Sequence, residues 1–285
     1  MFDELYIEVE THAGFPVLDT ISKTIRYGEN ILKKCVEIKG LKQSDSIILA
    51  MYRKILEQTD GIYILVDHGS NSALITTIRS QYETTIGFQH IFEKPQLIEK
   101  RALAYQVSYS NEHLHWFKKE INKGDILKRF KIEDLRRRIE FMETFLNSNK
   151  TISSVNERWH RKYKSTGSKR YPKWYSLYDD KANSFSALAR SIRGTSPLIY
   201  SSYSMEAHGY NALDGVYSDE INKKQYLFPL RGIPKELDNI LLACQLTNIC
   251  TMLLVKKYKP ELLDNYLDFY EWLNMRNENE NSLYK

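Results

Sequence analysis

The chain has 285 residues, of which 42% are hydrophobic and 27% are charged, and this apolar content excludes a wholly disordered chain. It holds only 12 glycines and 7 prolines, which excludes collagen-like and low-complexity classes and favours helices over turn-rich β folds. The formal net charge of +5 is mildly basic and does not by itself indicate nucleic-acid binding.

Cysteine usage and the N-terminus predict a cytoplasmic protein. Cys35, Cys244 and Cys250 form no CxxC pair and are too scattered for a disulfide framework, which fits a reducing compartment. The first 15 residues carry four acids before any base and no apolar stretch, so no secretory signal is expected. The most apolar stretch, residues 240–255, is shorter than the about 20 residues that a membrane span needs, so we expect a buried helix and no membrane partner.

Apolar residues at three- and four-residue spacing predict a series of helices. In chain order they cover residues 17–36, 44–67, 70–92, 95–120, 132–146, 183–193, 197–208, 234–257 and 260–275. Gly61 could interrupt the second of them, and Pro95 and Pro260 stand where a first helical turn tolerates proline. The Asn- and Glu-rich tail from Arg276 is expected to fray.

Two stretches lack this pattern: residues 158–175 are basic and aromatic, and residues 209–231 are polar and typical of an exposed loop. Any strands should be short and lie in these regions. We therefore predict the all-α class, a multi-helix bundle of about ten helices with short irregular middle and loop segments. The expected parts are an N-terminal helical segment (1–40), a bundle core (41–260) with a basic aromatic insertion at about 150–178, and a C-terminal helix with a frayed tail (261–285).

Several common cofactor and metal motifs are missing. The sequence has no GxGxxG or GxxxxGK[ST] phosphate loop, no HExxH and no GxSxG. His113 and His115 form an HxH pair, but helical residues two apart do not face each other. We therefore expect no cofactor and no bound metal.

The first candidate site is on the helix that follows Gly69. Arg79 and Glu83 lie four residues apart, on a polar stripe that borders the apolar face. Such a pair can simply be an internal ion pair that supports the helix. Alternatively, an arginine held by a glutamate presents a fixed planar set of donors to a phosphate or to a developing negative charge.

The second candidate site is the segment IYSSYSMEAHG, residues 199–209. On a helix, Tyr200, Ser204 and His208 share one face, and the helix should end at Gly209. His208 could cap the helix C-terminus, or it could act as a general acid or base beside the two hydroxyls. Arg190 and Arg193, just upstream, could add positive charge to the same pocket.

The third candidate is the run RWHRKYKSTGSKRYPKWY, residues 158–175, which holds seven Arg or Lys and no acid. Interleaved cations and rings suit a nucleic-acid strand, although such a run can also dock an acidic protein or pack between helices. The expected phosphate-binding residues are Arg161, Lys162, Lys164, Lys169 and Arg170, and the expected stacking residues include Trp159 and Trp174. Arg190, outside this run, is also expected to contact nucleic acid.

Two stretches together resemble a bacterial helical family of unknown function related to the HEPN and abortive-infection-like proteins. The first is ILVDHGSNSALITTIRSQYETTIGF, which holds Arg79 and Glu83, and the second ends in IYSSYSMEAHG, where Tyr200, Ser204 and His208 recur on a helix. The resemblance covers roughly residues 40–260. It implies an all-α bundle with a HEPN-like core, commonly dimeric, met in phage-defence or toxin systems.

The resemblance also implies metal-independent RNA cleavage. HEPN nucleases place an arginine four to six residues before the histidine, whereas residues 201–204, which include Ser201 and Tyr203, hold no arginine here, so Arg79 or Arg190 would have to replace it in space. The expected function is a HEPN-like ribonuclease with catalytic residues His208, Arg79, Glu83, Ser204 and Tyr200. The alternatives are a non-catalytic helical module that binds a protein partner or nucleic acid and, less favoured, a sensor that binds a nucleotide ligand.

Overall fold

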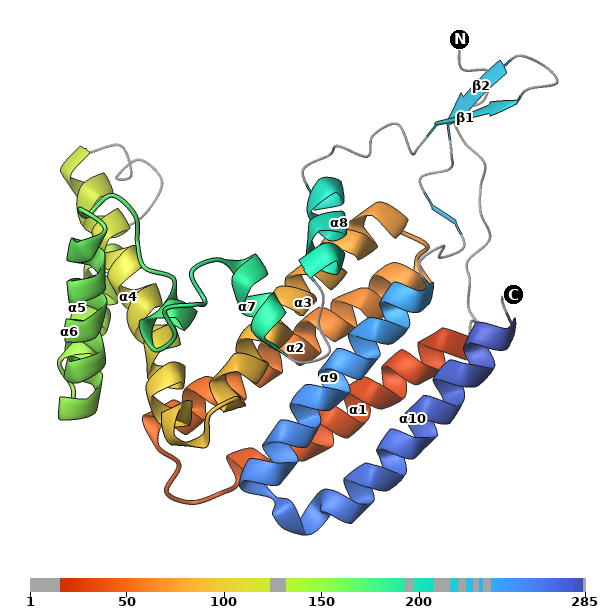
Figure 1. Ribbon diagram of the computed structural model, residues 1–285, viewed down its shortest axis with the longest axis horizontal. Helices are drawn as coiled ribbons and strands as arrows, with labels where there is room; N and C mark the ends of the chain where they lie inside the picture. Colours follow the sequence, from red (N-terminus) through yellow and green to blue (C-terminus); the bar gives the residue numbers. More distant parts are fainter. Residues whose placement is uncertain are drawn as a thin grey trace. The chain divides into compact units, whose positions relative to one another are not determined.

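A computed structural model describes residues 16–123, 132–192, 197–207, 216–219, 224–227, 231–232 and 237–283. Within these ranges the chain forms ten α-helices, three short 3-10 helices and one hairpin of two strands (Figure 1), which confirms the all-α multi-helix class. The helices are α1 (Pro16–Val36), α2 (Gln43–Asp67), α3 (Asn71–Phe92), η1 (Pro95–Leu97), α4 (Ile98–Lys123), α5 (Ile132–Leu146), α6 (Lys150–Ser165), η3 (Trp174–Leu177), α7 (Phe185–Ser191), α8 (Pro197–Ala207), α9 (Leu237–Tyr258), η5 (Pro260–Leu262) and α10 (Leu263–Leu283).

The chain divides into two compact units. Unit 1 takes the described residues within 1–39, 49–89 and 194–285, and unit 2 takes those within 40–48 and 90–193. This division differs from the expected one, which separated residues 1–40 and 261–285 from the core. The reason is that α1 packs along α9, and α10 packs against both, so the first and last helices belong to one unit (Figure 1).

The core of unit 1 is assembled from five helices that are distant in the sequence. Ile21 of α1, Ile62 of α2, Ile78 of α3, Tyr203 of α8 and Cys244 of α9 are all buried in one apolar cluster. Helix α9 is long and apolar enough to cross a membrane by length and composition, but 61% of that window is buried inside the protein. The expectation of a buried helix over residues 240–255 is confirmed.

A glycine makes the tight passage from α2 to α3. Gly69 has φ +65°, the left-handed region that glycine adopts without strain. Its carbonyl accepts a 3.0 Å hydrogen bond from the Gly232 backbone, and a Cβ at Gly69 would lie 2.7 Å from the Gly232 carbonyl oxygen. Both the turn and the close approach therefore require glycine at this position.

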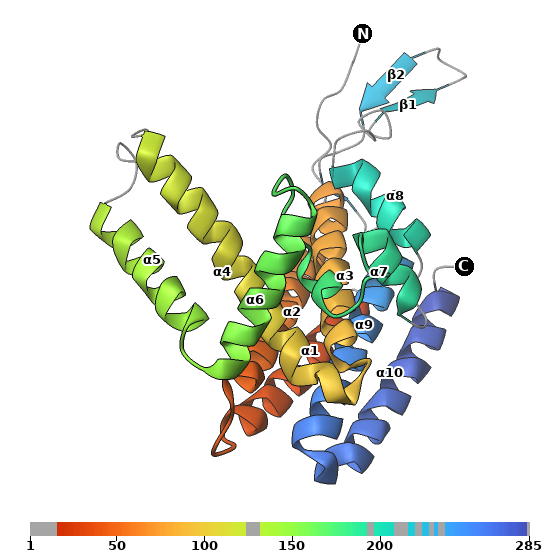
Figure 2. The ribbon, with the colours of Figure 1, turned by 60° about the vertical axis from the view of Figure 1, so that its left-hand side comes forward.

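Unit 2 is built around α4, which packs against α5, α6 and η3. Figure 2 shows α4, α5 and α6 side by side. Asn149 caps the N-terminus of α6: its side chain accepts a 3.0 Å hydrogen bond from the Ile152 backbone and so satisfies one free N–H of the first turn. Its buried residues are Ile152, Val155 and Trp159, at helical spacing.

Three local expectations differ from the structure, and one is confirmed. Helix α2 is continuous through Gly61, where an added Cβ would meet only Thr77 at 3.5 Å. Helix α6 was not predicted, because its basic residues were interpreted as part of an irregular insertion. The expectation that any strands are short and lie in the irregular stretches is confirmed, because β1 (Val216–Asp219) and β2 (Lys224–Leu227) form an antiparallel hairpin within residues 209–231, with Val216 paired to Leu227. Helix α10 continues beyond Arg276 to Leu283.

Candidate functional site

Helices α3 and α8 come together in unit 1 although they are far apart in the sequence. The Tyr200 hydroxyl of α8 accepts a 3.3 Å hydrogen bond from Nη2 of Arg79 on α3, across 121 positions. Three residues further along each helix, Tyr82 and Tyr203 meet edge to face with ring centroids 6.3 Å apart. The structure therefore brings the first two candidate segments side by side (Figure 1).

The guanidinium of Arg79 is fixed by two partners. Its Nε donates to Oε1 of Glu83 over 3.3 Å, and its Cζ lies 5.2 Å from the centre of the Tyr200 ring, in addition to the hydrogen bond with the hydroxyl. The Arg79 side chain is only 17% exposed, while that of Glu83 is 40% exposed. A guanidinium held in this way is suited to bind an oxyanion, because little orientational freedom remains to be lost.

Buried contacts hold α8 in place. The Tyr203 hydroxyl donates a 2.6 Å hydrogen bond to Asn239 of α9, and Tyr203 itself is buried in the unit 1 core. Ser204, one turn beyond Tyr200 on the same face of α8, is partly exposed. His208 and Arg193 lie outside the described residues. The residues that the structure brings together are thus Arg79, Glu83 and Tyr200, with Ser204 on the adjoining turn.

The prediction that Trp159 stacks on nucleic-acid bases is wrong. Trp159 is fully buried, because helical spacing places it with Ile152 and Val155 on the inner face of α6. Lys162 also serves the fold of unit 2, since its ammonium donates to the Ser176 carbonyl at 2.5 Å and to Asp180 at 2.9 Å. Part of the basic run therefore ties α6 to η3.

The other residues of the predicted nucleic-acid site remain on the surface of unit 2. Arg161, Lys164, Lys169 and Arg170 are exposed, and none of them is ion-paired to an acid in the described part of the chain. Trp174 is half-buried and meets Tyr105 edge to face at 5.4 Å. Arg190 is exposed on α7 and donates from Nε to the Ser186 carbonyl at 3.2 Å. It belongs to unit 2, whereas Arg79 belongs to unit 1.

Comparison with known proteins gives one match. The family described as "Family of unknown function (DUF5677)" matches residues 45–225, a span that contains Arg79, Glu83, Tyr200, Ser204 and His208. The chain belongs to this family. No curated protein and no solved structure matches it. The expected membership of an uncharacterised family is confirmed, and the relation to HEPN proteins stays a prediction.

This DUF5677 protein also holds a buried charged cluster in unit 2 that the sequence did not reveal. Ligand atoms of His90, Glu93 and Asp179 all lie within 4.8 Å of one another, a spacing that could hold a metal ion. However, Arg101, which is 1% exposed, donates from Nη1 to Glu93 at 3.0 Å, and its Nη2 lies 3.9 Å from Asp179. The guanidinium already supplies the positive charge, so we assign the cluster a structural role.

His90 is uncharged in this cluster near neutral pH. Burial, together with the positive charge of Arg101, lowers the pKa of His90 to about 4, although Glu93 and Asp179 act in the opposite direction. Its Nε2 lies 3.2 Å from the Tyr175 carbonyl. The partners come from α3, α4 and the chain after η3, so no spacing in the sequence could have indicated them.

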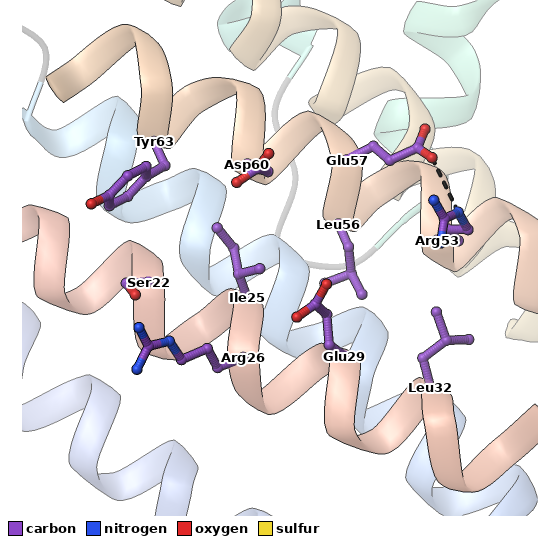
Figure 3. A pocket seen from close by; sticks show the side chains of 10 residues that line it. All are labelled: Ser22, Ile25, Arg26, Glu29, Leu32, Arg53, Leu56, Glu57, Asp60 and Tyr63. Carbon is purple, nitrogen blue, oxygen red and sulfur yellow. Dashed lines mark hydrogen bonds and ion pairs between the residues drawn. The ribbon is translucent and has the colours of Figure 1, made fainter. Parts of the chain in front are cut away.

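A pocket of about 470 Å³ lies in unit 1, lined by side chains of α1 and α2 (Figure 3). Its charged residues are Arg26 and Glu29 from α1 and Arg53, Glu57 and Asp60 from α2. Arg53 donates to Glu57 within the pocket at 3.1 Å. Three acids against two arginines leave no excess of positive charge for an anionic ligand, and no predicted site residue lines this pocket.

Proposed function

We propose that the protein is a metal-independent RNA-cleaving enzyme of the HEPN type, acting in phage defence or as a toxin, in which Arg79 binds the scissile phosphodiester. The main support for this proposal is the position of the Arg79 guanidinium, which is held between Glu83 of its own helix, α3, and Tyr200 of α8. No described residue accepts a hydrogen bond from its remaining terminal nitrogen, Nη1, which leaves a donor for a phosphate oxygen.

The proposed reaction is an in-line transfer within the RNA. The ribose 2′-oxygen attacks the adjacent phosphorus, the bond from phosphorus to the 5′-oxygen breaks, and a 2′,3′-cyclic phosphate and a 5′-hydroxyl end result. His208, the residue that follows α8 in the sequence, accepts the 2′-hydroxyl proton and returns a proton to the 5′-oxygen. Arg79 stabilises the additional negative charge on the phosphoryl oxygens. Tyr200 and Glu83 orient the guanidinium, and Ser204 positions the phosphate.

The test is cleavage of labelled single-stranded RNA by the full chain in the presence of EDTA, with identification of the product ends. We expect His208→Ala to slow cleavage by about 10²- to 10⁴-fold and Arg79→Ala by about 10²- to 10³-fold. Arg79→Lys should recover little, because an ammonium lacks the planar fork. An RNA with a 2′-deoxy residue at the cleavage site should remain intact.

Arg53→Ala is the matched control. Arg53 forms an ion pair with Glu57 at the same i, i+4 spacing and in the same unit, but it is 70% exposed and has no tyrosine partner from another helix among the described residues. This variant should cleave RNA as fast as the wild type. Full activity of Arg79→Ala or His208→Ala, loss of wild-type cleavage on chelation, or no cleavage by the wild type would overturn the proposal; the last outcome would favour the non-catalytic binding module.

A further inference from the structure

Unit 2 carries an exposed row of aromatic side chains along α4. Tyr105, Tyr109 and Trp116 lie at i, i+4 and i+11, positions that share one face of a helix, and they are 36%, 47% and 46% exposed. Large rings are usually buried, so three on one solvent-facing stripe suggest a contact surface. The Trp174 ring of η3 meets Tyr105 at 5.4 Å and extends this row.

The chain after α6 lies along α4 and brings cations to it. The ring of Tyr171, 39% exposed, meets His115 of α4 at a centroid distance of 5.6 Å. Lys173 lies close enough to Glu112 to oppose the rise in the pKa of that carboxyl that burial causes. Residues 171–174 therefore adjoin the aromatic stripe of α4, and the exposed residues 164–170 precede them directly in the chain. We call the stripe together with residues 164–174 the aromatic-basic face.

The positive charge of the aromatic-basic face, together with its rings, indicates which class of ligand it binds. Residues 158–173 hold seven Arg or Lys and no acid, and exposed cations such as Lys164, Lys169 and Arg170 form no ion pair with an acid in the described ranges. An acidic protein would satisfy the cations but would leave the row of rings without a specific partner. A single-stranded nucleic acid satisfies both, because its phosphates pair with the cations and its bases stack on the rings.

We propose that the aromatic-basic face binds single-stranded RNA without sequence preference, with bases on Tyr105, Tyr109 and Trp116 and the phosphate backbone along Lys164, Lys169 and Arg170. The choice of RNA as the ligand rests on the proposed function. The contacts themselves predict strong salt dependence and weak binding of duplex RNA, in which bases are not available for stacking.

The experiment measures binding of a 5′-labelled single-stranded RNA of about 15 nucleotides by fluorescence anisotropy, using the full chain with Arg79→Ala so that the RNA stays intact. We expect Tyr109→Ala combined with Trp116→Ala to raise Kd at least tenfold. Lys164→Ala combined with Arg170→Ala should raise Kd and also lower the slope of log K against log salt concentration by about 1.4, which is about 0.7 for each lost phosphate contact.

Two control variants test whether RNA binding depends on this surface or on any exposed ring or cation of the protein. Tyr270→Ala removes a ring of similar exposure (39%) from α10 in unit 1, and Arg137→Ala removes a cation from α5 in unit 2 that is 79% exposed. Both should bind RNA within twofold of the parent. Far-UV circular dichroism and urea unfolding check that every variant is folded as the Arg79→Ala parent is, which is expected because the side chains substituted in addition to Arg79 are exposed.

The outcomes distinguish this inference from the proposed function. RNA binding that depends on the aromatic-basic face, in a chain that never cleaves RNA, would support the inference and overturn the proposed function. Cleavage by the wild-type chain, with unchanged binding in both double variants, would support the proposed function and overturn the inference. Equal binding of single-stranded DNA would widen the ligand to any single strand and overturn the choice of RNA, and competition by polyglutamate as strong as by RNA would overturn the inference in favour of an acidic protein partner.

Discussion

Gly28 of α1 is packed directly against α2, and replacing it by alanine should destabilise unit 1. A Cβ at Gly28 would lie 2.5 Å from Oη of Tyr52 and 2.6 Å from Cδ2 of Leu56, closer than van der Waals contact allows. Tyr52 cannot easily move, because its side chain is fully buried and its hydroxyl forms a 2.6 Å hydrogen bond with Oγ1 of Thr251 on α9.

The magnitude follows from two opposing effects. Alanine in a helix interior gains about 0.5–1 kcal/mol over glycine. Overpacking costs about 1–3 kcal/mol, and if Tyr52 leaves Thr251, the unsatisfied buried hydroxyls cost about 1–3 kcal/mol more. We therefore expect Gly28→Ala to lower the free energy of unfolding by about 1–3 kcal/mol. At Gly61 an added Cβ meets only Thr77 at 3.5 Å, so Gly61→Ala should keep the gain of about 0.5–1 kcal/mol.

The assay is urea unfolding followed by far-UV circular dichroism on the wild type and the two variants. Both substitutions replace a glycine by alanine inside a helix of unit 1. They should shift the urea midpoint in opposite directions, because only the Cβ at Gly28 would come closer to other atoms than van der Waals contact allows. A Gly28→Ala chain as stable as the wild type, or a Gly61→Ala chain destabilised to the same extent, would refute the packing argument.

Two further predictions concern unit 2. The pKa of His90 in the folded chain is about 4, below the ordinary value of about 6.5, so between these values the unfolded chain binds the proton more strongly. The contribution of His90 to the free energy of unfolding should therefore be fully present above about pH 6.5 and fall by about 1–2 kcal/mol on going from pH 7 to pH 5, as measured by urea unfolding. His90→Gln should flatten this pH dependence. An unchanged slope in the variant would contradict the lowered pKa of His90. Trp159→Ala should destabilise the protein by about 3–5 kcal/mol, because the ring is fully buried, whereas Trp116→Ala on the surface should change stability by less than about 0.5 kcal/mol; equal effects in thermal unfolding would contradict the burial of Trp159.

The helices that sequence predicts well are those whose apolar period and end signals agree. Residues 132–146 were predicted with the bounds that α5 has, and residues 17–36 differ from α1 by one residue. Helix α6 carried the same kinds of signal, with Asn149 as its N-cap and Ile152, Val155 and Trp159 at helical spacing. Its dense positive charge favoured an irregular segment instead, and this also caused the wrong assignment of Trp159.

The candidate sites show where sequence information ends. The positions of Arg79 and Glu83 on one helix face follow from helical periodicity, but their approach to Tyr200 depends on how α3 and α8 pack in unit 1. The aromatic stripe of α4 has a clear period in the sequence, yet a period alone does not say whether its rings face solvent or core. That is why Trp159 was predicted exposed and the stripe of Tyr105, Tyr109 and Trp116 was not recognised.

Two arginine–glutamate pairs in unit 1 show what turns a local motif into a candidate site. Arg53 with Glu57 and Arg79 with Glu83 have the same spacing and similar Nε to Oε1 distances, 3.1 and 3.3 Å. The first pair is screened by water, since Arg53 is 70% exposed, and such a pair contributes less than about 1 kcal/mol. The second is 17% exposed at Arg79 and gains a tyrosine from a distant helix, which fixes the guanidinium and reduces the water around it. An anion that reaches Arg79 therefore meets a stronger and better oriented charge than it would at Arg53, and this difference in environment is what a comparison of Arg79→Ala with Arg53→Ala measures.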